Sequence, residues 1–240
     1  MVSKAESWKY RWETRGVRRV CFEREGLEAN GYLSQFGQDK WVAEVLLPNA
    51  RPGVFVDVGA HDGISFSNTY YLERELGWSG LAVEPNPEMY TKLKRQRRCI
   101  ALEGCVAPQD GRVRFLQISG YSQMLSGIVG EFDPRHKKRI ENEVRVYGGS
   151  SREIEVDGYT LGNLLATYGL THVDYLSLDV EGPEYLILES LDFRRFDVSV
   201  IGVENNYGDA RMPRLLKAKG YSLHSIVGDE FYVKCANSST

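Results

Sequence analysis

The stretch FVDVGAHDG, residues Phe55 to Gly63, joins an apolar run to an aspartate and then to two glycines four positions apart. The run at 54–58 is short and β-rich, which is typical of a buried parallel strand. Gly59 and Gly63 allow a sharp turn and a close approach of the backbone to a ligand. Their spacing is not the G-x-G-x-x-G that cradles a pyrophosphate, so the loop favours another kind of ligand.

Strand and helix patterns alternate along most of the remaining chain. Strands are expected at 80–83, 99–102, 173–178 and 198–203, helices at 67–76, 87–96, 160–168, 183–191 and 209–219, and a terminal hairpin around Gly228. Such alternation predicts an α/β fold with a mostly parallel sheet and helices on both faces.

The middle of the chain, 108–158, is less regular, with strands expected at 112–118 and 152–156. The charged segment 135–151 between them is interpreted as a solvated surface segment, or alternatively as a mobile lid over a substrate.

Residues 1–50 contain few β-branched residues and are predicted to form a helical extension or cap, with 51–236 as the main domain. The first 16 residues are basic and aromatic. We expect an arm that docks on its own domain, with a membrane-surface or partner helix as the alternative.

Composition narrows the function classes. The chain has 240 residues, 42% of them hydrophobic and 26% charged, with a net charge of −3. This balance argues against nucleic-acid binding by phosphate neutralisation. The four cysteines have no regular spacing, no apolar run approaches the ~18 residues of a membrane span, and no secretory leader is evident. We therefore expect a cytoplasmic protein without a transmembrane segment.

Polar residues lie at or after the ends of four of the predicted strands. Asp57 lies near the end of the first, Glu84 follows the second, Asp179 a later one, and the pair Glu204 and Asn205 the next. Ligands of open parallel sheets bind beyond the carboxyl ends of strands, so these groups should share one edge. A negative charge under the loop suits a cationic ligand, and an acid after the second strand suits a ribose diol. S-adenosylmethionine has both features; simple capping of strand ends is the alternative.

Three blocks of sequence resemble the FkbM family of S-adenosylmethionine-dependent methyltransferases. They are SQFGQDKWV, VFVDVGAHDGISFSNTYYLERELGWSGLAVEPNPEMYTKL and YLSLDVEGPEYLILESL, and the similarity spans roughly 34–234. The resemblance implies a class I methyltransferase, Rossmann-like fold with a seven-stranded, mostly parallel sheet whose last strand is antiparallel. It also implies O-methylation of hydroxyls on sugars or on polyketide-type and glycosylated natural products.

The same resemblance implies a cofactor site. It assigns Ser65 to the cofactor carboxylate, Glu84 to the ribose and the residues after the third strand to the adenine, while His61 stands where the family often has asparagine. The full implied set is Asp57, Gly59, His61, Asp62, Gly63, Ser65, Glu84, Pro85, Cys105, Val106 and Asp179.

A weaker similarity concerns a metal. In metal-dependent O-methyltransferases of the catechol and macrolide-sugar types, an aspartate and an acid–asparagine pair hold Mg²⁺, and Asp179, Glu204 and Asn205 occupy those positions here. Hard oxygen ligands are what Mg²⁺ requires. Gly182 stands where the catechol enzymes carry a basic lysine, which excludes a lysine base at that position.

We expect methyl transfer by in-line displacement onto a hydroxyl of a sugar, glycan or glycosylated natural product. Asp179 is the expected metal ligand and base, and Glu181 is an alternate base or an acid that stabilises a helix N-terminus. Ser126 and Gly127 are expected in the acceptor pocket. The acceptor is a small molecule or glycan, and a homo-oligomer stays open. A catalytically inactive cofactor-binding scaffold is the alternative function.

Overall fold

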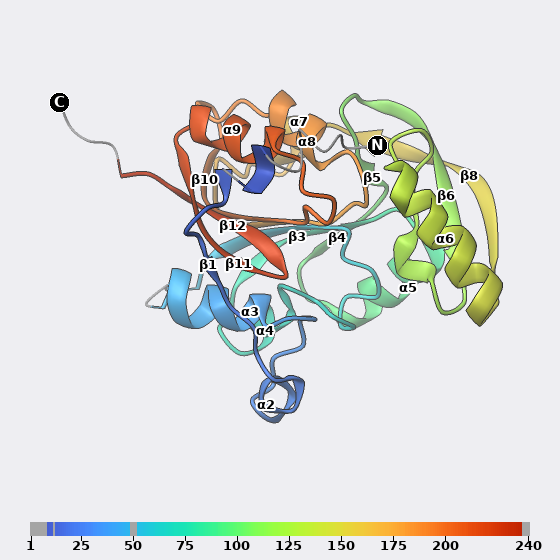
Figure 1. Cartoon of the computed structure of the whole chain (residues 1–240), viewed down its shortest axis with the longest axis horizontal. Coiled ribbons are helices and arrows are strands. Elements are labelled where there is room, and N and C mark those ends of the chain that lie inside the picture. The colour runs from blue at the N-terminus through green and yellow to red at the C-terminus, as the bar shows by residue number, and fades with distance from the viewer. Residues whose placement is uncertain (1–8, 12, 49–51, 237–240) are drawn as a thin grey trace.

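A central sheet organises the computed structural model, which describes residues 9–11, 13–48 and 52–236 (Figure 1). Its order is β1-β11-β12-β10-β9-β2-β3-β4. The strands are β1 (Arg18–Arg19), β2 (Val54–Val58), β3 (Ser79–Glu84), β4 (Ile100–Glu103), β9 (His172–Leu178), β10 (Asp197–Val203), β11 (Tyr221–Val227) and β12 (Asp229–Lys234).

Strand β12 is antiparallel to both of its neighbours, β10 and β11, whereas β10, β9, β2, β3 and β4 pair in parallel. This confirms the predicted class I methyltransferase fold with its antiparallel last strand. The eighth strand corrects one expectation: the short β1, from the segment predicted to be helical or irregular, pairs in parallel with β11. A two-residue edge strand is held by main-chain bonds, so no side-chain pattern announces it.

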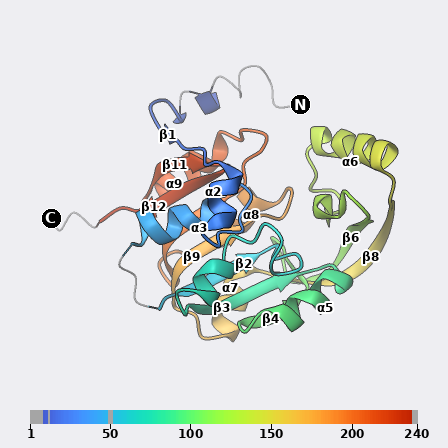
Figure 2. The ribbon, with the colours of Figure 1, turned by 90° about the horizontal axis from the view of Figure 1, so that it is seen from below.

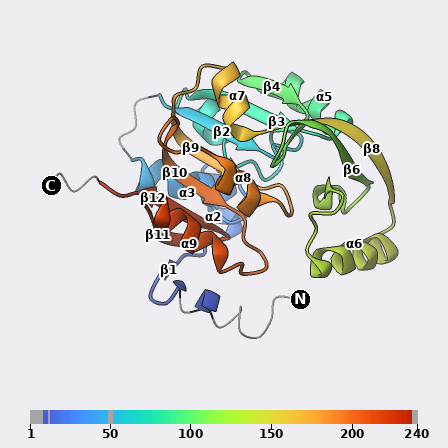
Figure 3. The ribbon, with the colours of Figure 1, turned by 90° about the horizontal axis from the view of Figure 1, so that it is seen from above.

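Helices cover both faces of the sheet. One face carries α3 (Gln38–Trp41) with its π-helical continuation η1 (Val42–Leu46), α4 (Tyr70–Arg74) and α5 (Pro87–Gln96), seen in Figure 2 together with the outlying α2 (Arg24–Ala29). The other face carries α7 (Leu161–Thr167), α8 (Glu184–Ser190) and α9 (Arg211–Ala218), seen in Figure 3.

Strand β2 feeds a core on each side of the sheet, which explains why its sequence is apolar at nearly every position. Val56 and Val58 join the buried cluster that includes α7, α8 and α9, whereas Phe55 joins a cluster with Trp41 and Val42. The predicted division near residue 50 stays a prediction, although Trp41 and Val42 share this core with the main domain.

A second sheet, of order β5-β8-β6-β7, extends from the body of the molecule. Its strands are β5 (Cys105–Val106), β6 (Gly111–Ser119), β7 (Gly127–Ile128) and β8 (Ser150–Tyr159), and the β6–β8 connection carries the 3₁₀ turn η2 (Gln123–Leu125) and helix α6 (Pro134–Tyr147). Figures 2 and 3 both show α6 standing apart from the helices of the central sheet.

Helix α6 is a regular element in the segment that was interpreted only as a solvated surface segment or a mobile lid. Asp133 accepts a hydrogen bond from the Arg135 amide at 2.7 Å, Pro134 occupies the first turn, and Gly148 ends the helix with a φ of 76°. These are ordinary start and stop features. Only His136 and Ile140 of the helix are buried, so its apolar stripe was too thin to stand out.

The described part of the amino-terminal arm lies against the carboxyl-terminal hairpin. The Tyr10 hydroxyl donates to Glu230 Oε1 at 2.6 Å, a contact of the kind expected for a docking arm. Trp8 and Trp12, which also shaped that expectation, lie outside the described residues. Among the described helices, none has the length and apolar character needed to cross a membrane.

Candidate active site

A cavity of about 310 Å³ opens at the carboxyl ends of β2, β3, β9 and β10. We call it the cofactor cavity. The predicted site residues that line it are Asp57, Gly59, His61, Ser65, Glu84, Pro85, Cys105, Val106, Ser126, Asp179, Glu181 and Glu204. Four predicted residues, Asp62, Gly63, Asn205 and Gly127, are not in its lining. The parallel sheet thus gathers the strand-end acids as its geometry requires.

Gly59 is required by the protein itself rather than by a ligand alone. Its φ is +87°, and a Cβ there would lie 1.8 Å from the Asp179 carbonyl oxygen. The turn after β2 therefore sits directly on the turn after β9. Glycine at this position brings the loop Gly59–Gly63, which we call the cofactor loop, close to the acidic residues that follow β9.

Gly63 and Asp62 hold the loop in its conformation from the side away from the cavity. A Cβ on Gly63 would come within 2.8 Å of the Arg97 and Leu93 side chains. Asp62 accepts the Ile64 amide at 2.9 Å, and the charge-assisted bonds it receives hold its pKa well below its usual range despite partial burial. Both residues support the cofactor loop without facing the cavity.

Arg97, at the end of α5, anchors the loop through a fully buried network. Its guanidinium donates to Glu73 at 3.0 Å, to the Gly63 carbonyl at 3.2 Å and to the Thr69 hydroxyl at 2.9 Å. Thr69 in turn donates to Asp57 at 2.5 Å. Burial raises the pKa of Asp57, and the Arg97 charge 3.9 Å away opposes that rise. The network favours the ionised form that a cationic ligand needs.

Glu84 lies at the end of β3 with both carboxylate oxygens engaged by backbone. Oε2 accepts the His61 amide at 2.7 Å and Oε1 accepts the Asn86 amide at 2.8 Å. Burial raises the pKa of Glu84 to about 7. Each oxygen keeps a further lone pair, so the carboxylate can still accept a hydroxyl from the cavity.

His61 is held in an unusual state inside the cavity wall. Its φ is 51°, which is uncommon for a residue other than glycine. Both ring nitrogens are buried, and within the described part of the chain neither has a hydrogen-bond partner; Asp62 Oδ1 is 3.7 Å from Nδ1. A buried orphan nitrogen is costly, which indicates a polar ligand group at this point.

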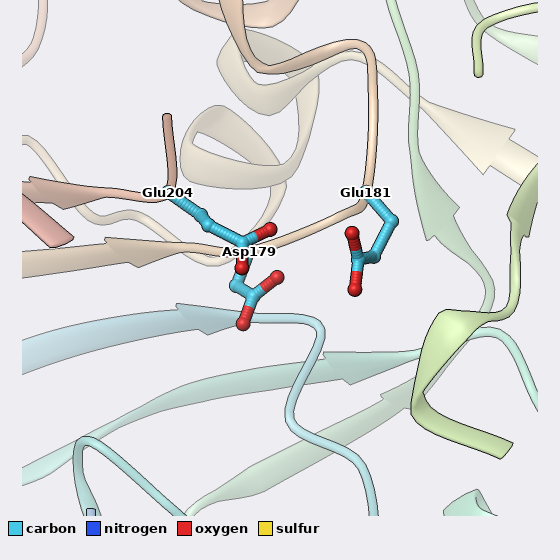
Figure 4. A group of neighbouring side chains, drawn as sticks. All are labelled: Asp179, Glu181 and Glu204. Carbon is cyan, nitrogen blue, oxygen red and sulfur yellow. The ribbon is translucent and has the colours of Figure 1, made fainter. Parts of the chain in front are cut away.

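Three carboxylates form an acidic centre beside the loop: Asp179, Glu181 and Glu204 (Figure 4). One oxygen from each lies within 4.8 Å of the others. Burial and the Asp229 charge raise the pKa of Asp179, and burial and Asp179 raise the pKa values of Glu181 and Glu204. A bound cation or a shared proton would relieve this repulsion.

Asn205, the third expected metal ligand, has its side chain engaged by neighbouring residues, and its role as a ligand stays a prediction. Its amide donates to Glu230 at 3.0 Å and to the Asp209 carbonyl at 3.2 Å, and its oxygen accepts the Asp209 amide at 2.7 Å. The side chain thus fastens the turn after β10 to β12. Glu181 is the third carboxylate near Asp179 and Glu204.

Glu181 is positioned by a contact that the sequence did not predict. It has a φ of 60°, and its Oε2 lies 3.2 Å from Nδ1 of the fully buried His136 on α6. His136 Nε2 lies 3.1 Å from the Leu125 carbonyl, and its ring stacks on Phe132. A lone histidine in a charged segment gives no signal of such a contact.

Asp229 is a second residue that sequence reasoning missed. It was interpreted only as part of a hairpin turn, yet it lines the cofactor cavity and receives Gln38 at 3.2 Å and Asn68 at 3.5 Å. Burial raises its pKa to about 6. The antiparallel return of β12 brings it beside Asp179, a proximity visible only once the sheet order is known.

The residues of the cavity fit both expected groups. Asp57, Glu84 and the orphan His61 nitrogens suit the cationic, ribose-bearing S-adenosylmethionine. The three convergent carboxylates are hard oxygen donors of the kind that Mg²⁺ binds.

Comparison with known proteins gives one family and several distant structures. The family model described as "Methyltransferase FkbM domain" matches residues 57–223. "Methyltransferase 1" of Beauveria bassiana is 28% identical over 181 residues, covering 70% of this chain and 72% of that protein.

Two solved structures illustrate the distant likeness. A TehB-like SAM-dependent methyltransferase from Corynebacterium glutamicum has a TM-score of 0.39 and 13% identity, with 95% of each chain covered. A putative RNA methyltransferase from Pyrococcus horikoshii has a TM-score of 0.42 and 11% identity, covering 98% of this chain and 100% of that one.

Proposed function

Because the chain belongs to the FkbM methyltransferase family, we propose that it moves the methyl group of S-adenosylmethionine onto a hydroxyl oxygen of a sugar, glycan or glycosylated natural product. One observation carries the proposal. The acidic centre of Asp179, Glu181 and Glu204 borders the same cavity that Asp57 and Glu84 line. Proton-accepting groups and cofactor-binding groups thus share one site.

The residues divide the task by position. S-adenosylmethionine supplies an electrophilic methyl group. Glu84 and His61 hold its ribose end, and Asp57 faces its charged end. The nucleophile must lie behind the methyl carbon at about 3 Å in a site that excludes water. A hydroxyl is a weak nucleophile until its proton is removed, so a positioned carboxylate contributes strongly. Asp179 and Glu181 are the two candidates for that role.

The proposal includes a divalent cation held by Asp179, Glu181 and Glu204. Mg²⁺ would polarise the hydroxyl and stabilise the developing alkoxide. The protein's own contribution is to hold three carboxylates together at a cost in mutual repulsion. It also keeps Glu181 in place through His136.

The test combines binding and turnover. Thermal shift with S-adenosylhomocysteine, with and without MgCl₂, should show stabilisation by the nucleoside and further stabilisation by the metal. Incubation of a sugar panel with labelled S-adenosylmethionine should give a methylated product. Asp179→Asn and Glu181→Gln should each lower turnover by about 10²-fold, since each removes a proton acceptor. The variant that still contains the base should keep the pH dependence of the turnover rate that wild type shows, and this comparison identifies the base.

Glu141→Gln, an exposed change on the outer side of α6, is the control. Nucleoside binding without transfer to any acceptor would favour a catalytically inactive scaffold. Full activity in EDTA and in Asp179→Asn would remove the metal from the mechanism. No stabilisation by the nucleoside would overturn the whole proposal.

A further inference from the structure

A second cavity of about 270 Å³ adjoins the cofactor cavity at the acidic centre. Glu181, Glu204 and Asn206 line both cavities, whereas the residues of the cofactor loop line only the first. The acidic centre is therefore the common wall of two spaces. In Figure 4 the Glu204 side chain extends toward Asp179, and Glu181 points from its loop toward the same space.

We propose that this second cavity binds the methyl acceptor, and that it selects neutral or cationic hydroxyl compounds over anionic ones. The inference rests on the proposed function and deepens it. In-line displacement puts the nucleophile and the departing sulfur on opposite sides of the methyl carbon. The acceptor thus needs a space that meets the cofactor cavity without overlapping it.

The wall of the second cavity suits a hydroxyl-rich molecule. Aromatic rings from three different segments line it, and Asn206 adds an exposed amide; the rings are those of Phe132, Tyr185 and Tyr207. Pockets of this kind combine apolar faces with a few polar groups that fix orientation.

Charge decides the class of acceptor. The wall carries one cation, Arg211, and six carboxylates: Glu131, Asp133, Glu181, Glu184, Glu204 and Asp209. Arg211 is paired with Asp209 at 2.6 Å, and Asp133 is paired with Arg135 at 2.8 Å.

The other four carboxylates have no lysine or arginine within ion-pair distance among the residues the structure describes. Glu184 instead accepts backbone amides of Val180 and Gly182. With the proposed divalent cation bound, the three carboxylates of the acidic centre still exceed its charge by one, and Glu131 adds a further negative charge. A phosphate or carboxylate on the acceptor would therefore meet net negative charge, whereas a hydroxyl or ammonium would find hydrogen-bond acceptors.

Glu181 lines both cavities whereas Asp179 lines only the first, so the Glu181 oxygen that does not hold the cation can face the acceptor and serve as the base. The acceptor oxygen forms a bond to the methyl carbon as the carbon–sulfur bond breaks. The hydroxyl proton passes to the Glu181 carboxylate, and the sulfur keeps the bonding pair and leaves as S-adenosylhomocysteine.

Saturation-transfer NMR in the presence of S-adenosylhomocysteine tests the site without requiring turnover. The probes are glucosamine, glucose and glucose 6-phosphate. Glu131→Lys reverses a charge in the second cavity, and Glu141→Lys makes the same change on the exposed side of α6, outside both cavities. Wild type should bind glucosamine and glucose more tightly than glucose 6-phosphate. Glu131→Lys should narrow that preference by about fivefold, equivalent to about 1 kcal/mol, and Glu141→Lys should not.

Equal effects of the two substitutions, tighter binding of glucose 6-phosphate to wild type, or no contact with any probe would overturn the inference. A turnover assay separates the two proposals. If the probes bind as expected but no methylated product forms, the proposed function is wrong and the assignment of the second cavity as a binding site is supported. If products form on phosphorylated acceptors regardless of Glu131, the site assignment fails and the function stands.

Discussion

Gly59 and Glu84 illustrate how single residues of this site serve the fold and the ligand at once. Gly59 closes the distance between the turns after β2 and β9, and Glu84 ties the cofactor loop to the turn after β3. A change at either position should therefore affect stability and cofactor affinity together.

Gly59→Ala should be strongly destabilising, by about 3 kcal/mol or more, because a left-handed φ is combined with a clash against the Asp179 backbone. Gly169→Ala is the matched control: its φ is +67°, but nothing lies within 4 Å of the added carbon, so it should lose only about 1 kcal/mol. Urea unfolding measures both. Equal losses would show that the close approach is not important.

Glu84→Gln should weaken S-adenosylhomocysteine binding at pH 8, because an amide offers one acceptor oxygen where the carboxylate offers two. Wild type should itself bind less tightly as the pH falls through about 7, where Glu84 takes up a proton. Calorimetric titration at pH 6 and pH 8 checks both. An affinity independent of pH in wild type would contradict the assignment of Glu84 to the ribose.

At the scale of elements, α5 and α6 both act on the site from outside the sheet. Arg97, directly after α5, donates to the Gly63 carbonyl of the cofactor loop, and His136 of α6 contacts Glu181. Neither contact was predicted. Both pair residues that are more than 30 positions apart, and both depend on how a helix is oriented.

Arg97→Met should cost about 3–5 kcal/mol, since Glu73 and Asp57 would be left buried without their cation. Arg98→Met, one position along and exposed, provides the control, because only its backbone amide is used in the network. Chemical denaturation gives the difference. If both variants unfolded at the same urea concentration, the buried network would not be supporting the loop.

His136→Ala should loosen α6, because the ring contacts Leu125, Phe132 and Glu181 and is fully buried. If the free energy of locally unfolding α6 falls by about 1–2 kcal/mol, trypsin should cleave at the basic residues of α6 roughly five- to thirtyfold faster. Glu141→Ala, on the exposed side of the helix, should leave the rate unchanged. Digestion followed by mass spectrometry locates the cut.

The sequence predicted elements well where their patterns were strong. Strands such as Val54–Val58 are buried on both faces and therefore are apolar at nearly every position. Helix α6 buries only two side chains, and β1 depends on main-chain pairing, so neither has such a pattern. The strand-end acids were predictable because parallel strands share one carboxyl edge. Asp229, His136 and Arg97 reach the site through topology and helix orientation, which one-dimensional spacing does not encode.

At the scale of the whole molecule, the protein gathers buried acids in one region. Burial raises the pKa values of Glu84 and Glu184 to about 7 and that of Asp229 to about 6. These groups hold protons in the folded state at pH values where the unfolded chain has released them. The contribution of these groups to the free energy of unfolding should therefore be complete below about pH 4 and should be lost as the pH rises from there to about 7.

Asp229→Asn should remove part of that dependence, about 1.4 kcal/mol of the change between pH 5 and pH 8. The asparagine oxygen can still accept from Gln38 and Asn68, so the hydrogen bonds that involve this side chain can persist. Urea unfolding at the two pH values measures the change. If the free energy of unfolding fell by the same amount from pH 5 to pH 8 in wild type and in the variant, Asp229 would not titrate in this range.

The pairing of β1 with β11 has a practical consequence for handling this protein. A shortened form that begins after Arg19 would leave the seven-residue β11 as an open sheet border, where another copy can add a strand. Such a preparation should polymerise during concentration. Because Tyr10 rests on Glu230 near the cavity, bulky purification tags are better joined after residue 236 than before residue 9.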